Sequence, residues 1–104
     1  MRYVIGRFSV RPGKRAEFLE HAKAYVAASR ADTGCIYFDI APMPDNPDGL
    51  VMVERWDTQD NHKAHQASTY AAAFNPTFGA LALKGEFQEM NVDEPDNVVF
   101  DFSK

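Results

Sequence analysis

A carboxylate, an indole and an imidazole lie close together in this sequence, where they could carry out acid–base chemistry on an aromatic compound. Glu54 and Trp56 are two residues apart, so a strand would turn both side chains to one face. His65 follows nine residues after Trp56, on what the pattern predicts as the next helix. An imidazole transfers protons near neutral pH, and an indole stacks on planar rings. We therefore predict His65 as a base, Trp56 as an aromatic wall and Glu54 as a group that orients His65.

Each of these residues also has a purely structural interpretation, which the spacing alone leaves open. His65 could be a partly buried histidine bonded to a carbonyl or a carboxylate. Trp56 could be a core residue that anchors the sheet to a helix. Glu54 could form a structural salt bridge, with Arg7 or Arg55 as its partner.

Other polar side chains are weaker candidates for the same site. The hydroxyl of Tyr70 could donate to a substrate oxygen, and Tyr37 and Asp39 share one face of a predicted strand that could line the cavity. His62 and His65 lie three residues apart, a spacing compatible with two metal ligands. No third ligand is indicated nearby, so we predict no metal site.

Length and composition exclude several classes of protein. The 104 residues suffice for one domain, which we expect over 1–104. A net charge of −4 without clustered lysines and arginines argues against nucleic acid, and no apolar run reaches the ~20 residues that span a bilayer. No glycine-rich phosphate loop is present, which removes nicotinamide, flavin and nucleotide cofactors. Without a signal-peptide pattern, and with Cys35 as the one cysteine, we expect the cytoplasm.

The apolar spacing predicts an α+β fold with the order β-α-β-β-α-β. Predicted strands cover 2–10, 35–41, 50–57 and 85–92, and a predicted helix covers about 14–30. Thr58 is expected to cap a second helical region, which Pro76 interrupts or ends. After an acidic connector, the C-terminal extension 93–104 is predicted to hold a short strand over 98–102. Two helices on one face of a four-stranded antiparallel sheet form the ferredoxin-like arrangement.

Both faces of the predicted sheet carry apolar residues, although a chain of this length has helices for only one. In the first strand, Val4 and Phe8 lie on one face and Ile5 on the other. In the third strand, Met52 and Val53 are likewise on opposite faces. We therefore expect a homodimer in which sheet packs against sheet, and the strand over 98–102 is a candidate for reaching the partner.

Several short stretches, taken in order, resemble the antibiotic biosynthesis monooxygenase family. They are the opening strand with Val10-Arg11-Pro12-Gly13-Lys14, Thr33-Gly34-Cys35, Val53-Glu54-Arg55-Trp56 followed by His65, and Lys84-Gly85-Glu86-Phe87-Gln88-Glu89-Met90-Asn91. The resemblance covers residues 2–92, and its last stretch is similar to the end of the quinol monooxygenase branch. It implies a ferredoxin-like subunit that pairs into a dimeric α+β barrel.

The resemblance also implies a reaction that needs no metal and no flavin. A bound phenol or enol loses a proton to a base, and the anion is electron-rich enough to reduce O2 by one electron. The radical pair then recombines at carbon, and loss of water gives a quinone or a related ketone. We accordingly predict a cofactor-independent monooxygenase that acts on a small aromatic or quinol-like compound.

The sequence departs from the family pattern at three places. A Thr-Pro-His stretch that often follows the helix histidine is replaced by Ser68-Thr69-Tyr70, so a mechanism with two histidines there is not expected. Haem-degrading members have an asparagine where this chain has Gly6, and an iron-binding histidine where it has Phe74. Phenylalanine cannot coordinate iron, so we set haem binding aside.

Two other functions remain open at this point. The same pocket could isomerise a small carbonyl metabolite, with His65 again moving the proton. Alternatively, the chain could be a non-catalytic ligand-binding or stress-response dimer that keeps the fold without the chemistry, because a fold does not fix a function.

Overall fold

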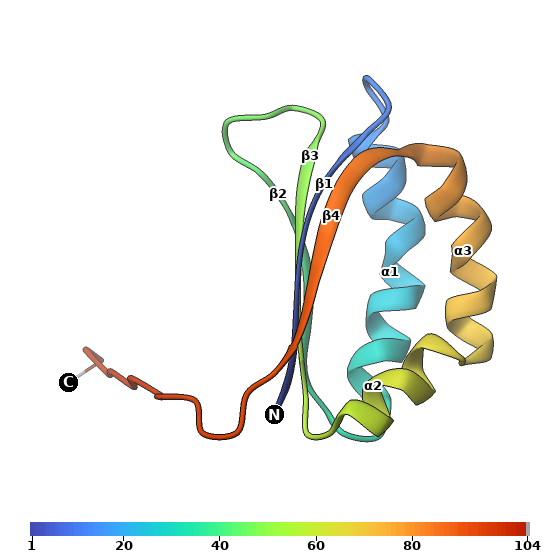
Figure 1. Cartoon of the computed structure of the whole chain (residues 1–104). Helices are drawn as coiled ribbons and strands as arrows, with labels where there is room; N and C mark the ends of the chain where they lie inside the picture. Colours follow the sequence, from blue (N-terminus) through green and yellow to red (C-terminus); the bar gives the residue numbers. More distant parts are fainter. Residues whose placement is uncertain (104) are drawn as a thin grey trace.

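Residues 1–103, which the computed structural model describes, form one sheet with helices on a single face (Figure 1). The elements are β1 (Arg2–Val10), α1 (Arg15–Ala31), β2 (Cys35–Pro42), β3 (Gly49–Trp56), α2 (Gln59–Gln66), α3 (Thr69–Leu81) and β4 (Ala82–Asn91). The antiparallel sheet has the strand order β2-β3-β1-β4. The predicted ferredoxin-like α+β fold is therefore confirmed. None of the helices described is long and apolar enough to cross a membrane.

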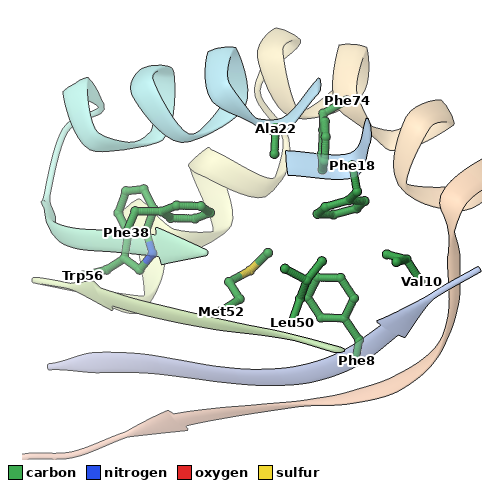
Figure 2. Packing of buried hydrophobic residues seen from close by; sticks show 9 residues of the cluster. All are labelled: Phe8, Val10, Phe18, Ala22, Phe38, Leu50, Met52, Trp56 and Phe74. Carbon is green, nitrogen blue, oxygen red and sulfur yellow. The ribbon is translucent and has the colours of Figure 1, made fainter. Parts of the chain in front are cut away.

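The hydrophobic core lies between the sheet and α1 (Figure 2). On β1, Val4, Phe8 and Val10 are buried, whereas Ile5 points to the other face and is 43% exposed. Phe18 of α1 meets the ring of Phe8 edge-on, with ring centroids 5.4 Å apart. Burying one phenylalanine side chain contributes roughly 1.5–3 kcal/mol. The alternation along β1 and the helical spacing along α1 together fix which faces meet.

The second helical region consists of two helices with a short break between them. Thr58 caps α2 as predicted, because its hydroxyl accepts a hydrogen bond of 3.1 Å from the backbone N–H of Asn61. The break lies at 67–68, where the hydroxyl of Ser68 accepts from the backbone N–H of Ala71 and begins α3. This turn separates α2 from α3. The buried residues of α2 are His62 and His65.

The prediction that Pro76 interrupts or ends a helix is wrong. Pro76 lies inside α3, which continues to Leu81. The residues on either side of it explain why, since Phe74 and Phe78 both pack on Phe18 with ring centroids 5.7 and 6.1 Å apart. A proline in a helix interior costs roughly 3 kcal/mol. Aromatic packing against α1 offsets that cost.

The C-terminal part of the chain differs from its prediction in two ways. β4 begins at Ala82 rather than Gly85, because α3 leads directly into extended backbone that pairs with β1. Residues 98–102 form no strand in this single chain, whose sheet already ends at β4. Figure 1 shows this tail leaving on the side of the sheet opposite the helices. Its four apolar side chains are 74–89% exposed: Val98, Val99, Phe100 and Phe102.

Within residues 1–103, no helix or strand covers the face of the sheet away from the helices. Ile5 of β1 and Tyr37 of β2 are both exposed there. Arg55 lies over the ring of Tyr3, 5.5 Å from its centroid, and its Nε is buried without a hydrogen-bond partner among the described residues. The expectation that this face carries apolar residues is confirmed, while the homodimer that would cover it stays a prediction.

Candidate active site

A cavity of about 230 Å³ lies between the helix-side face of the sheet and the three helices. Its wall is mainly apolar and aromatic, formed by Val4, Tyr25, Met52, Phe74, Phe78 and Phe87. Buried Glu54, His62 and His65 form its polar inner end, and the exposed residues Gln66, Asn75 and Glu89 lie at its mouth. An apolar cleft with a few convergent polar groups is the usual form of a small-molecule site.

Glu54 is the carboxylate at the inner end of this cavity. β3 turns it to the helix side, where it is only 5% exposed. Its Oε1 accepts a hydrogen bond of 3.0 Å from the indole of Trp56, and the Nε2 atoms of His62 and His65 lie 3.7 and 3.8 Å from the same oxygen. Burial raises the pKa of Glu54 to about 7, with the Trp56 hydrogen bond opposing the shift. Such a carboxyl group can both take up and release a proton near neutral pH.

His65 lies beside Glu54 but has the electrostatics of a neutral imidazole. Its side chain is buried, and its two ring nitrogens face the hydroxyl groups of Tyr25 and Tyr70. Burial, together with the neighbouring His62, lowers the pKa of His65 to about 4. The prediction that His65 is the base remains untested, but Glu54 has the pKa that suits this role better.

His62 completes the inner end of the cavity, a placement that the sequence did not indicate. It is buried, and its Nδ1 accepts a hydrogen bond of 3.1 Å from Nε of Arg2. Because a guanidinium group only donates, this nitrogen carries no proton in neutral His62. The proton is therefore on Nε2, which faces Glu54. Burial lowers the pKa of His62, which favours this neutral form.

Trp56 is placed as a core residue rather than as a wall of the cavity. It is fully buried and is not among the residues that line the cavity. Figure 2 shows it among the buried side chains of the core, which also include Phe38. Its ring centroid is 4.7 Å from that of His65, and its indole N–H donates to Glu54. Trp56 thus acts on the cavity through these two neighbours.

The three predicted substrate-binding residues also lie outside the cavity lining. Tyr70 is close, but its hydroxyl bonds His65 and Asp32 behind the cavity. Tyr37 pairs in register with Arg55 and so belongs to the open face of the sheet. Asp39 forms an exposed ion pair of 2.7 Å with an arginine of α1. Of these three residues, only Tyr70 contacts the cluster of polar residues that contains Glu54 and His65.

Several residues of the site were missed, and most of them left a signal in the sequence. Tyr25 belongs to the apolar stripe of α1, where a hydroxyl needs a partner. Arg2 has the same strand parity as buried Val4, which is unusual for a charged residue. Glu89 shares its parity on β4 with Phe87 and faces the cavity with it. Their partners could not be predicted, since each comes from a distant part of the chain.

The predicted salt bridge of Glu54 with Arg7 or Arg55 is wrong. Both arginines have the opposite parity on their strands, so they lie on the open face. The groups that surround Glu54 are instead two histidines and an indole. Within residues 1–103, no set of three or more His, Cys, Asp or Glu side chains is arranged to hold a metal ion.

Known proteins share both the sequence pattern and the fold. The model of the family "Antibiotic biosynthesis monooxygenase" matches residues 1–77, and so does not include β4. A protein of Bacillus subtilis (strain 168) named "Putative monooxygenase YcnE" is 32% identical over 65 residues, which are 62% of this chain and 68% of the relative.

Two solved structures illustrate the likeness in fold. Rv0793 from Mycobacterium tuberculosis superposes with a TM-score of 0.79 at 25% identity, over 91% of this chain and 98% of the other. A Deinococcus radiodurans protein described as a "putative antibiotic biosynthesis monooxygenase" gives a TM-score of 0.85 at 17% identity, over 95% and 99% of the two chains. At such low identity the second likeness shows the fold alone.

The family model, however, covers 77 of the 104 residues, including every polar group at the inner end of the cavity. This chain therefore belongs to the antibiotic biosynthesis monooxygenase family.

Proposed function

We propose that this chain is a monooxygenase that oxidises a small, uncharged aromatic compound bearing a hydroxyl group, such as a quinol, with O2 and without metal or flavin. The observation that carries the proposal is Glu54, a carboxyl group at the inner end of an aromatic cavity whose pKa burial raises to about 7. A base is most effective when its pKa lies near the working pH. Membership of the family supports the reaction class.

In the proposed reaction Glu54 takes the proton of the substrate hydroxyl, which leaves an electron-rich aromatic anion. One electron passes from this anion to O2, and the radical and superoxide join through a new C–O bond at a ring carbon. The resulting peroxide takes a proton back from Glu54. Its O–O bond then breaks, the ring carbon loses its hydrogen, and water leaves. A phenol and O2 thus give a quinone and water, so no external reductant is required.

The side chains around Glu54 suit this role. The N–H groups of Trp56 and His62 face its Oε1 and favour the anion, whereas burial favours the neutral acid. No hydrogen bond to Oε2 occurs within residues 1–103, so this oxygen is free to meet a substrate. Phe78 and Phe87 line the cavity, with their ring centroids 6.1 Å apart. In this proposal they form the aromatic wall for the substrate ring, in place of Trp56.

The charge of the cavity bears on which substrates it accepts. Glu89 at the mouth adds a second carboxylate to that of Glu54, and Arg2 forms an ion pair with Glu89 at 3.3 Å. An anionic substrate would meet like charge at both ends of the cavity, which disfavours binding. We therefore place uncharged phenols and quinols before carboxylated ones.

The proposal includes a homodimer in which the open faces of two sheets meet. Exposed Ile5 and Tyr37 support this arrangement because a partner sheet would cover both. With Cys35 as the one cysteine, a reducing compartment such as the cytoplasm fits the chain.

The test is oxygen consumption by chelator-treated protein with a panel of quinols and phenols. Wild type is compared with Glu54→Gln, which keeps the shape and removes the base, and with Glu86→Gln as the matched control. Glu86 lies on the same strand as Glu89, is exposed and pairs in register with Arg7 on the open face. Protein-dependent uptake that falls at least a hundredfold only in Glu54→Gln is the expected result, within the range for a general base.

Other outcomes would redirect the proposal. Uptake that appears only when a metal is added back would overturn the cofactor-free reaction. If no compound consumes oxygen, proton exchange next to a carbonyl becomes the better function, because a carboxyl group with a pKa near 7 also suits an isomerase. Deuterium incorporation into a small ketone, lost in Glu54→Gln, would identify that case.

A further inference from the structure

A chain of hydrogen bonds runs from the surface of the molecule to His65, on the side of the imidazole away from the cavity. Asp32 caps the C-terminus of α1 and accepts a hydrogen bond of 2.6 Å from the hydroxyl of Tyr70. The oxygen of Tyr70 lies 2.7 Å from Nδ1 of His65. Three elements, namely α1, α2 and α3, thus meet through one unbroken line of short contacts.

The single proton of Tyr70 decides the direction of these bonds. The hydrogen bond from Tyr70 holds the pKa of Asp32 below its usual value, so Asp32 is a carboxylate that can only accept. Burial raises the pKa of Tyr70 to about 12, so the hydroxyl keeps its proton and donates it to Asp32. The contact with His65 must then be a bond that Nδ1–H donates to the oxygen of Tyr70. In neutral His65, Nε2 is consequently the nitrogen that has a lone pair and no proton.

This lone pair faces the polar inner end of the cavity. Nε2 of His65 lies 3.2 Å from the hydroxyl of Tyr25, which can donate to it, and 3.8 Å from Oε1 of Glu54. On the other side of Glu54, His62 has the opposite tautomer, because Arg2 donates to its Nδ1 and leaves the proton on Nε2. Glu54 therefore lies between one histidine that presents an N–H and one that presents a lone pair.

We propose that Tyr70 and Asp32 are positioning residues that fix His65 as the Nδ1–H tautomer, so that its Nε2 can accept a hydrogen bond from Glu54 once this carboxyl group holds the proton of the substrate. The interaction of Nε2 with Glu54 during the reaction rests on the proposed function, whereas the tautomer of His65 does not. Tyr70 thus acts through His65 and not by touching the substrate.

The proton balance of this step is simple. Glu54 gains a proton as the substrate O–H bond breaks, and its new O–H group donates to Nε2 of His65. His65 itself stays neutral, because burial and His62 lower its pKa to about 4. Its Nδ1–H donates to Tyr70, which donates to ionised Asp32. The proton passes from Glu54 to the peroxide when the peroxide forms, and Glu54 is then an anion again.

The titratable groups that face His65 come from β3, from the three helices and from the turn after α1. They are Glu54 from β3, His62 from α2, Tyr25 from α1, Tyr70 from α3 and Asp32 from the turn after α1. Removal of the Asp32 charge, by Asp32→Asn, takes away the only anion besides Glu54 in this set. It is therefore expected to lower the protonation of His65 further at any pH.

The decisive experiment is nitrogen NMR of the three imidazoles in ¹⁵N-labelled protein, which separates protonated from unprotonated ring nitrogens. In the wild type, Nδ1 of His65 is expected to be protonated and Nε2 bare, with the reverse for His62. In Tyr70→Phe, the Nδ1 preference of His65 is expected to be lost, while His62 keeps its pattern. Exposed His21 on α1 is the internal reference, and Tyr37→Phe, on the open face, is the matched control.

Two results would overturn the inference. One is a wild-type His65 that carries its proton on Nε2, and the other is a Tyr70→Phe protein in which His65 does not change. Because Tyr70→Phe keeps the ring, a well-dispersed amide spectrum should show that it folds. If it does not fold, Asp32→Ala gives the same reading, since Tyr70 then loses the side-chain acceptor of its proton and can donate to Nδ1 of His65 instead.

Turnover adds the part that depends on the proposed function. Tyr70→Phe is expected to lower kcat about 10- to 100-fold with little change in KM, the size of effect seen when the partner that orients a histidine is removed. A protein with the expected tautomers but no oxygen uptake would refute the proposed function and leave the positioning intact. Normal kcat in Tyr70→Phe would refute the role of His65 as the hydrogen-bond acceptor for protonated Glu54.

Discussion

The indole N–H of Trp56 donates to the carboxylate of Glu54, two residues earlier on the same face of β3, at 3.0 Å. Both side chains are almost fully buried, so this bond acts in a medium where it matters more than in water. It is the main force that opposes the effect of burial on the pKa of Glu54. Trp56 thereby sets how readily the buried carboxyl group ionises.

Replacement of Trp56 by phenylalanine should move the activity to higher pH. The lost hydrogen bond favoured the carboxylate, so the pKa of Glu54 rises in the variant and less of the base is ionised at pH 7. The acidic limb, which reports Glu54 in a plot of log kcat/KM against pH, should shift to higher pH by about one unit, a typical size for one charged hydrogen bond. An unchanged profile at reduced amplitude would mean that Trp56 serves only packing.

Replacement of Glu89 by glutamine should shift the same profile in the opposite direction. The charge of Glu89 raises the pKa of Glu54, and its removal also leaves Arg2 without its ion pair at 3.3 Å. Both changes favour ionised Glu54. The variant should in addition accept carboxylated phenols with a lower KM than the wild type does, because one like charge has left the mouth of the cavity. Glu86→Gln, on the open face, should change neither quantity.

The parts of the site that could be predicted are those encoded within a few residues. Parity on one strand puts Glu54 and Trp56 on the same face, and the cap at Thr58 fixes where α2 begins and hence where His65 lies. Parity does not reveal that the indole turns back onto the carboxylate instead of lining the cavity. That outcome follows from packing between strands, since Phe38 of β2 belongs to the same buried cluster as Trp56.

The parts that could not be predicted depend on contacts between distant segments. Arg2 reaches His62 across 60 residues of chain, and Tyr25 reaches His65 across 40. Likewise, the Pro76 error arose because a local rule was applied where aromatic packing from α1 decides. Burial, and with it the pKa order of Glu54 and His65, is a property of the assembled layers rather than of either residue's neighbours in sequence.

The unfolding free energy should depend on pH because of Glu54. Its pKa is about 7 in the folded chain and 4.5 in the reference state, so its contribution is fully present below pH 4.5 and is lost as pH rises through 7. At roughly 1.4 kcal/mol per pKa unit, the loss is about 3 kcal/mol. Glu54→Gln lacks it. The difference in unfolding free energy between wild type and variant, from urea titrations at several pH values, should therefore move in favour of the variant across this window.

The prediction uses the difference in unfolding free energy between wild type and Glu54→Gln because His65 changes stability with pH in the opposite direction. With a pKa lowered to about 4 from 6.5, His65 contributes stability above pH 6.5 that is lost as pH falls through 4. The stability of the wild type alone mixes both groups. Parallel curves for wild type and Glu54→Gln would contradict a raised pKa at Glu54.

A methyl group at Gly6 should change the cavity more than it changes stability. Gly6 of β1 pairs in register with Phe87 of β4, and a Cβ there would overlap the ring of Phe87. The ring is 40% exposed and can turn aside, so we expect Gly6→Ala to cost about 1 kcal/mol or less. The displaced ring alters the wall of the cavity, and KM should rise several-fold. Gly79→Ala, where nothing lies within 4 Å of the added carbon, is the control that should leave KM unchanged.

Removal of residues 93–104 should weaken association of the chain with itself. Val98, Val99, Phe100 and Phe102 are largely exposed in the single chain. Figure 1 shows the C-terminal tail that carries them on the side of the sheet opposite the helices. Each such side chain contributes roughly 1.5–3 kcal/mol when it becomes buried, so losing even one from an interface raises the dissociation constant at least about tenfold. Sedimentation equilibrium of the full chain and of the chain ending at Val92 measures this directly. A full chain that stays monomeric at every concentration would contradict the homodimer. Equal dissociation constants for the two chains would instead show that the sheets meet without help from the tail.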